Sequence, residues 1–227
     1  MASTYDVAGT TVTMPVEVRD ASAGTAVFDV DAAAAGALLP DAFEVVAAGP
    51  GRAHLAVVVV DYRDNDLGSY LEVGLMLFVR PRGGGDDGTF IFRLPVDQPF
   101  TCEAGRRIWG FPKTVEEIEL DYAESSVTAT LQMDGELVLR LTLPRDAGAD
   151  GEMPPTPMTA YTVLDGVPHA TTFTQGGTGF SMNAEATIEL GSHPIAKELA
   201  GLGLPAAPAF TTWTEHMRAT FEAPQPL

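Results

Sequence analysis

The sequence predicts a mainly β protein of the α+β class, built from one curled or barrel-like antiparallel sheet with a few short helices. Apolar and β-branched runs bounded by turn residues recur about every 10 to 15 positions, which is typical of strands. Segments with helical features are few and short. The chain has 227 residues, of which 45% are hydrophobic and 19% charged, so it is long enough to bury a sizeable core. We expect a single domain over residues 1–227.

The strands are predicted from these runs in chain order. The Gly-rich stretch 83–88 is expected to be a hairpin loop. Asp134-Gly135 is a dipeptide that favours a two-residue hairpin turn, and the apolar residues on either side of it alternate with polar ones. The predicted strands lie at 26–30, 43–47, 53–62, 70–79, 89–94, 127–133, 137–143, 159–164, 170–174 and 184–190.

Three short helices are predicted. Asp31 is a suitable N-cap for a helix over residues 32–39. Proline opens the other two, which are expected at 99–109 and 194–201.

The charge balance excludes several function classes. Lys and Arg number 13 against 31 Asp and Glu, which gives a net charge of −18. Such a field repels nucleic acid and anionic lipid surfaces. Apolar runs are far shorter than the roughly 20 residues of a membrane helix. With one cysteine, Cys102, the chain has no internal disulfide and no Cys-rich zinc site, which fits a cytoplasmic protein. Cys102 itself is interpreted as a small buried hydrophobe.

The cations are mostly arginine, since the only lysines are Lys113 and Lys197. An acidic surface with so little lysine predicts a halophilic protein, whose self-repulsion concentrated salt would screen. The alternative is an ordinary acidic protein from a GC-rich genome. No metal and no organic cofactor are expected. Asp61, Asp64 and Asp66 are interpreted as a solvated acidic turn, and the histidines at 54, 169, 193 and 216 show no metal-ligand spacing.

Glu72 is a candidate functional residue because its strand, 70–79, is apolar on both faces. Strand alternation places Glu72 on one face with Tyr70, Gly74 and Met76. A carboxylate on an apolar face needs a partner or a proton. Glu72 is therefore either a structural ion-pair partner or a general acid/base in a cavity.

Lys113 is the second candidate. It follows Trp109, Phe111 and Pro112, and the proline stiffens the approach to the lysine. The spacing does not fit a phosphate-binding loop, in which lysine directly follows the second glycine. Lys113 is either a solvated residue at the start of a strand or a desolvated amine.

Two motifs in the right order resemble a known family. The run GRRIWGFPK, ending at Lys113, resembles the Gly-Arg-Glu-(apolar)-x-x-(aromatic)-Pro-Lys signature of acetoacetate decarboxylases and their superfamily. The run GSYLE, ending at Glu72, is similar to the family's Gly-x-Tyr-x-Glu strand. Leu38-Leu39-Pro40 resembles the end of the family's first helix. The resemblance covers residues 15–145 and is vague beyond them.

This resemblance implies roles for several residues. Lys113 would be the Schiff-base lysine, Glu72 the active-site carboxylate and Arg19 the arginine that receives a substrate carboxylate. An alternative for Arg19 is a surface arginine beside Asp20. The substrate would also meet three aromatic residues, Tyr70, Trp109 and Phe111. The chain departs from the family at Thr114, where the decarboxylases carry a second lysine.

Burial alone can lower the pKa of a lysine by about 3 to 5 units, so we expect desolvation to lower the pKa of Lys113 without the second lysine. The implied reaction is decarboxylation of an acetoacetate-like β-keto acid through an iminium on Lys113. Two alternatives remain: aldol, dehydration or cyclisation chemistry on 2-keto acids, and a non-catalytic small-molecule carrier. The expected partner is a small keto acid, and a homo-oligomer is plausible. Four weaker candidates for the pocket wall are Phe173, Phe180, Met182 and Trp213.

Overall fold

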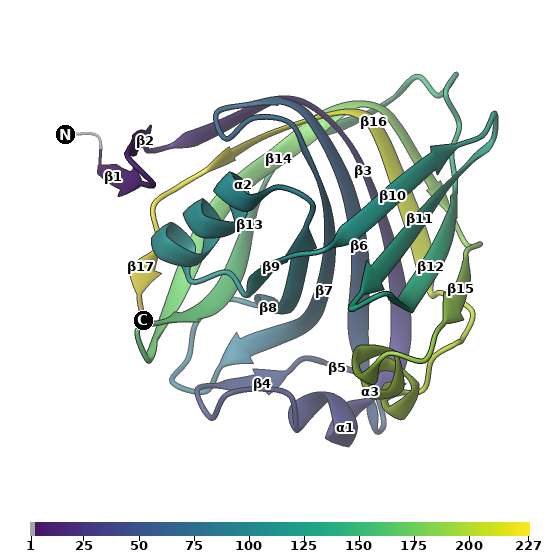
Figure 1. The fold of residues 1–227 in the computed structure, drawn as a ribbon. Coiled ribbons are helices and arrows are strands. Elements are labelled where there is room, and N and C mark those ends of the chain that lie inside the picture. The colour runs from purple at the N-terminus through teal and green to yellow at the C-terminus, as the bar shows by residue number, and fades with distance from the viewer. Residues whose placement is uncertain (1–2) are drawn as a thin grey trace.

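Seven strands close into a barrel, as Figure 1 shows for the computed structural model, which describes residues 3–227. They are β3 (Val16–Asp31), β6 (Arg52–Asn65), β7 (Tyr70–Pro81), β8 (Gly88–Val96), β13 (Gly151–Leu164), β14 (Val167–Asn183) and β16 (Phe210–Phe221). Their order around the ring is β7-β6-β3-β16-β14-β13-β8, and β8 pairs back to β7. Among the neighbouring pairs of these seven strands, only β13–β8 is parallel. The predicted mainly β, barrel-like fold is confirmed.

Short strands extend the barrel sheet and a second sheet packs beside it. The short strands are β4 (Phe43–Val45), β5 (Ala47–Gly49), β9 (Lys113–Val115) and β17 (Gln225–Pro226), while β1 (Thr4–Val7) and β2 (Thr10–Thr13) form a separate hairpin. The second sheet, at the right of Figure 1, consists of β10 (Glu117–Tyr122), β11 (Ser126–Met133), β12 (Glu136–Pro144) and β15 (Thr187–Leu190).

The hairpin between β11 and β12 forms where the sequence predicts it. Asp134 and Gly135 have φ of 53° and 75°, as a turn with two left-handed residues requires. The predicted loop at 83–88 also joins two antiparallel strands, β7 and β8.

The helices are short: α1 (Ala32–Gly36), α2 (Pro99–Ala104) continued by the π-helical turn η1 (Gly105–Trp109), and α3 (Pro194–Leu202). Asp31 caps α1 as predicted, because its Oδ1 accepts a hydrogen bond from the Ala34 amide at 2.8 Å. This helix ends three residues earlier than predicted, and residues 37–39 form turns. None of the helices among residues 3–227 is long and apolar enough to cross a membrane.

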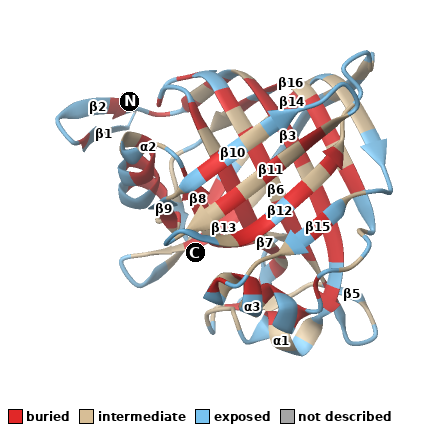
Figure 2. Ribbon diagram, turned by 45° about the vertical axis from the view of Figure 1, so that its right-hand side comes forward, coloured by how far each residue is buried: buried red, intermediate tan, exposed pale blue. Residues whose placement is uncertain are grey.

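Alternation along the barrel strands separates two cores, and Figure 2 shows the resulting bands of buried and exposed residues. The outer core joins the barrel wall to the second sheet and includes Phe28, Leu75 and Leu141. The inner core draws residues from opposite sides of the ring, such as Ile91 on β8 and Met217 on β16, together with α2 and η1. The inside of the barrel is thus filled at the level of α2.

Four barrel segments were not predicted: the first half of β3, residues 151–158 of β13, residues 175–183 of β14 and the whole of β16. The β3 and β16 segments carry small or polar residues on their inward faces, for example Ala21 and Ala23 on β3 and Thr212 and Thr214 on β16. Such residues give a weak apolar alternation, although the strands pair with each other over most of their length.

Candidate active site

The two predicted reactive residues meet in the inner core. Glu72 lies on β7 and Lys113 begins β9, which pairs in parallel with β8. The Lys113 Nζ lies 2.7 Å from the Glu72 Oε2, and the two side chains are 4% and 9% exposed. The contact is a buried ion pair. Among residues 3–227, Glu72 and Lys113 are the only Asp, Glu, Lys or Arg in the buried class.

Three hydroxyl-bearing side chains surround this pair. Lys113 Nζ donates a hydrogen bond to Thr101 Oγ1 on α2 at 3.2 Å. The same ammonium lies 4.8 Å from the centre of the Tyr70 ring, within the range of a cation–π contact. The Tyr62 hydroxyl on β6 donates to Glu72 Oε1 at 3.3 Å. Each of the two buried charged groups therefore has a hydroxyl partner in addition to the other charged group.

The local sequence explains how the lysine enters this space. A Cβ added at Gly105 would lie 2.6 Å from the Lys113 Cδ and 2.8 Å from its Cε, so only glycine leaves room for the aliphatic stem. Gly110 ends η1 with φ of 68°, a left-handed conformation that favours glycine. The Phe111 amide then donates to the Gly105 carbonyl at 3.1 Å, which turns the chain back and aims Lys113 along α2.

Two opposing influences act on the pKa of Lys113. Burial is the largest and lowers it, but the Glu72 carboxylate and Tyr70 raise it, and the net pKa is raised. The expectation that desolvation dominates is therefore wrong for this resting arrangement, because a carboxylate lies 2.7 Å from the amine. The resting lysine is an ammonium whose proton is within reach of Glu72.

The predicted aromatic neighbours divide into two groups. Tyr70 contacts the ammonium directly. Trp109 and Phe111 are buried in the same inner core and stack with ring centres 5.5 Å apart. The Trp109 Nε1 donates to the Glu222 carbonyl at 2.9 Å, so its polar atom faces the C-terminal segment. The two rings therefore pack in the inner core at the end of η1 and do not contact the ammonium directly.

Thr114 faces away from the buried pair. Neighbouring residues of β9 point to opposite faces, and Thr114 is exposed while Lys113 is buried. A cavity of about 390 Å³ lies beside β9 on this outer side, and Lys113 and Thr114 both border it, together with Arg93, Arg106 and outer-core residues such as Leu75. A second lysine at position 114 would point to this outer side, so its absence removes no cation from the inner face.

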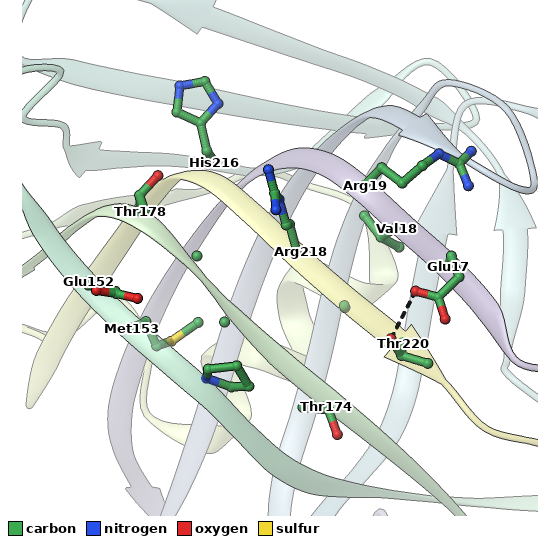
Figure 3. Close-up of a pocket in the computed structure, with 14 residues that line it drawn as sticks. Glu17, Val18, Arg19, Glu152, Met153, Thr174, Thr178, His216, Arg218 and Thr220 are labelled. Atoms are coloured by element: carbon green, nitrogen blue, oxygen red, sulfur yellow. Dashed lines mark hydrogen bonds between the residues drawn. The ribbon is translucent and has the colours of Figure 1, made fainter.

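Arg19 is not brought to the Lys113–Glu72 pair, which corrects its predicted role as the receptor of a substrate carboxylate. Its neighbour Val18 points into the inner core, so Arg19 points outward. Its guanidinium lies 2.8 Å from Asp64 and 2.6 Å from Asp66. Figure 3 shows it at the rim of a separate cavity of about 690 Å³, on the same sheet face as Arg218.

The weaker pocket-wall candidates also divide. Phe173 packs against the inner core and stacks on Phe221 at 5.0 Å. Trp213 belongs to the outer core instead, so its assignment to the pocket is wrong. Met182 is 63% exposed, and Phe180 is half-buried on the same strand.

Two residues of the cluster, Tyr62 and Thr101, were not predicted. Tyr62 ends the predicted strand 53–62, and it reaches Glu72 only because the β6–β7 register pairs Tyr62 with Tyr70. A single sequence carries no direct signal for such a register. Thr101 reaches the Lys113 ammonium because α2 packs beside the lysine side chain. Residues 3–227 contain no group of three His, Cys, Asp or Glu arranged to hold a metal ion.

The family model for acetoacetate decarboxylase (ADC) matches residues 4–222. The chain belongs to the acetoacetate decarboxylase family. No curated protein matches the chain significantly.

Solved structures of this family share the fold. The acetoacetate decarboxylase from Legionella pneumophila subsp. pneumophila str. Philadelphia 1 is 17% identical, with 94% of this chain and 87% of that chain covered and a TM-score of 0.72. An acetoacetate decarboxylase-like enzyme from Sphingomonas wittichii RW1 is 18% identical. The match covers 95% of this chain and 94% of that chain, with a TM-score of 0.60. The enduracididine biosynthesis enzyme MppR, complexed with pyruvate, is 16% identical. The match covers 93% of this chain and 90% of that chain, with a TM-score of 0.61.

Proposed function

We propose that this acetoacetate decarboxylase family member is a carbon–carbon lyase that decarboxylates a β-keto acid through a Schiff base on Lys113. The observation that carries the proposal is the ion pair of 2.7 Å between Lys113 and Glu72 inside the barrel. A buried ammonium beside one carboxylate has a single nearby base to which its proton can pass. No second acid or base is needed to release the amine.

The first half of the reaction forms the iminium. Glu72 accepts the proton of the Lys113 ammonium, and the neutral Nζ attacks the ketone carbon of the substrate. The carbonyl oxygen takes the proton that the attacking nitrogen loses and becomes a hydroxyl, and Glu72 returns the proton it accepted to this hydroxyl as water leaves. The product is a protonated Schiff base with its positive nitrogen β to the substrate carboxylate.

The second half breaks the carbon–carbon bond. The electron pair of that bond moves toward the iminium nitrogen, which releases carbon dioxide and leaves an enamine. Protonation of the enamine carbon and addition of water then give the ketone and free Lys113. In an apolar, water-poor site the loss of a carboxylate charge is favoured, and the ionised Glu72 repels a second carboxylate placed beside it.

A second candidate is carbon–carbon bond formation or dehydration on a 2-keto acid, in which the carboxylate is retained. It is favoured by the shared fold with MppR, a structure of which contains pyruvate. The geometry around Glu72 favours decarboxylation instead, because a retained carboxylate needs a cation and Arg19 is paired on the outer face.

Trapping with borohydride tests the proposal. The protein is incubated with acetoacetate or pyruvate, reduced, digested and analysed by mass spectrometry. We expect an adduct on Lys113, loss of the adduct in Lys113→Arg, and an unchanged adduct in Lys197→Arg, which alters the exposed lysine on α3. Release of carbon dioxide with acetoacetate supports the lyase. An adduct without gas supports the second candidate, and no adduct with any keto acid supports a carrier and contradicts both.

A further inference from the structure

The cavity of about 390 Å³ beside β9 carries an excess of positive charge. Its charged border consists of Arg93 on β8, Arg106 on η1 and Lys113, and among residues 3–227 no Asp or Glu borders it. The chain as a whole has 31 Asp and Glu against 13 Lys and Arg. The larger cavity of Figure 3, by contrast, has both arginines and glutamates on its border. The cavity beside β9 therefore departs from the acidic character of the protein.

A β-bulge turns Arg93 toward this cavity. Arg93 of β8 pairs with Leu75 of β7, whereas Ile91 pairs with the next residue along β7, so Phe92 is the extra residue of the bulge. Arg93 consequently shares the outer face with Leu75, and both border the cavity. The guanidinium donates to the Phe92 carbonyl at 2.8 Å and to the Glu198 carboxylate on α3 at 3.1 Å. These two bonds hold Arg93 in place and leave its Nε for another acceptor.

Arg106 supplies a second, unpaired charge. Its side chain is exposed, and it forms no ion pair and no side-chain hydrogen bond with another of residues 3–227. Its neighbour Arg107 is also exposed, but it lies 3.8 Å from Glu103 and does not border the cavity. Two guanidiniums and the one carboxylate that pairs with them, that of Glu198, leave one positive charge uncompensated at the cavity.

Apart from Thr114, the rest of the cavity border is apolar. Leu75 on β7 and Leu131 on β11 belong to the outer core, while Met133 on β11 and Ile195 on α3 are half-buried. An arginine fork recognises a carboxylate, and covering the half-buried apolar side chains favours a ligand with an apolar body. The volume lies within the range of small-molecule sites.

We propose that this cavity is a second binding site, separate from the reactive lysine, for a compact organic monocarboxylate with an apolar tail. Arg93 and Arg106 receive the carboxylate, and the tail packs between the barrel and the second sheet. One uncompensated positive charge matches a monoanion better than a phosphate dianion. Lys113 also borders the cavity, but its ammonium lies on the inner face against Glu72. The inference is thus independent of the reaction proposed at Lys113.

Calorimetric titration of the full chain at neutral pH and constant ionic strength tests the ligand class. The probes are hexanoate, the uncharged hexanamide and the dianionic hexyl phosphate. We expect saturable binding of hexanoate at one site, and binding of the other two weaker by about tenfold or more, as loss of a charge-assisted hydrogen bond predicts. No saturation up to about 10 mM hexanoate, or equal binding of hexanamide, would overturn the proposal. Tighter binding of hexyl phosphate would overturn the carboxylate assignment.

The consecutive arginines of η1 give a matched pair of variants. Arg106→Gln and Arg107→Gln each remove one exposed cation, but only Arg106 borders the cavity. We expect Arg106→Gln to weaken hexanoate binding by about tenfold or more, and Arg107→Gln to change it by less than about twofold. Thr114→Lys adds a cation to the border and should tighten binding by about threefold or more. Equal losses in the two arginine variants would show that hexanoate responds only to the general surface field, and would overturn the site.

A blocked lysine shows whether the two sites are separate. Reduction of the pyruvate adduct with borohydride leaves a carboxylate fixed on Lys113, and the modified protein should bind hexanoate within about twofold of the untreated protein. Loss of hexanoate binding on this modification would place the ligand at the reactive lysine and overturn a second site. If no keto acid forms an adduct, the proposed function fails, and the comparison of Arg106→Gln with Arg107→Gln still decides this inference.

Discussion

Gly105 lies directly against the side chain of Lys113. A Cβ at position 105 would lie 2.6 Å from the lysine Cδ, closer than real side chains approach. The main chain of η1 thus packs against the side chain that carries the Lys113 ammonium to Glu72.

Gly105→Ala is therefore expected to displace the lysine. Overpacking of this kind costs about 1–3 kcal/mol of unfolding free energy, and the rate of trapped adduct falls with it. Gly201→Ala is the matched control, because a Cβ at this position of α3 meets nothing within 4 Å; it leaves the adduct unchanged and stabilises the helix by about 0.5–1 kcal/mol. A normal adduct rate in Gly105→Ala would show that the lysine does not need this path.

Glu72→Gln removes the larger of the two causes that raise the pKa of Lys113, and it leaves Tyr70, which also raises it, and burial, which lowers it. We expect the pKa measured from the pH dependence of acylation at Lys113 to fall. Loss of one partner of a buried ion pair destabilises a protein by about 3–5 kcal/mol. Here the loss is greatest at low pH, where the amine must remain charged, and diminishes as pH rises through the lowered pKa. Without its proton acceptor, adduct formation slows by about 10²-fold or more. An unchanged or higher lysine pKa contradicts the assignment.

Thr114→Lys restores the second lysine of the family signature. Because residue 114 is exposed on the face of β9 opposite Lys113, the new ammonium is expected to leave the pKa of Lys113 and the adduct rate unchanged. The unfolding free energy changes by less than about 0.5 kcal/mol, as for other surface substitutions. A lowered pKa of Lys113 in this variant would show that the two positions share an environment.

Protonation of the surface carboxylates that pair with arginine is expected to contribute to unfolding at acid pH. The hydrogen bonds of Arg63 lower the pKa of Asp20 from 3.8 to about 2. A carboxyl with a lowered folded-state pKa contributes stability above its unfolded pKa, and this contribution is lost as pH falls from about 4 toward 2. Asp20→Asn should flatten the decline of Tm over this interval. Asp41→Asn, at a position with no ion pair among residues 3–227, should not.

The acidic surface predicts a positive response to salt. Glu117, Glu119 and Asp121 alternate along the exposed face of the edge strand β10, opposite the uncharged Gln132, Thr130 and Thr128. We expect Tm to rise between 0.1 and 2 M KCl, because the Debye length shortens from about 10 Å to below about 3 Å. Neutralising the three carboxylates together should raise Tm at low salt and weaken its salt dependence. A Tm that falls with KCl contradicts a halophilic adaptation.

Much of the barrel and the Lys113–Glu72 pair could be predicted from the sequence, because the features that indicate them are local. Strand 70–79 alternates strongly enough to place Glu72 on an apolar face, and Asp134-Gly135 has one favoured turn. The family motif then singles out Lys113. These features are local, so no knowledge of strand pairing is needed to find them.

The remaining parts depend on pairing that a single sequence does not contain. The outward position of Arg19 follows from the burial of Val18 in the first half of β3, which was not predicted. Tyr62 joins the site through its register with Tyr70. The raised pKa of Lys113 depends on the distance to Glu72, which composition and hydrophobic neighbours do not determine. Each of these is a long-range relationship between strands.

The two members of the reactive pair belong to different parts of the fold. Glu72 is built into the barrel wall, whereas Lys113 arrives on the α2–η1–β9 segment, which pairs with β8 and accepts a hydrogen bond from Thr162 of β13 at the Trp109 carbonyl. The ion pair of 2.7 Å is therefore a long-range contact, which forms only when this segment packs against the barrel.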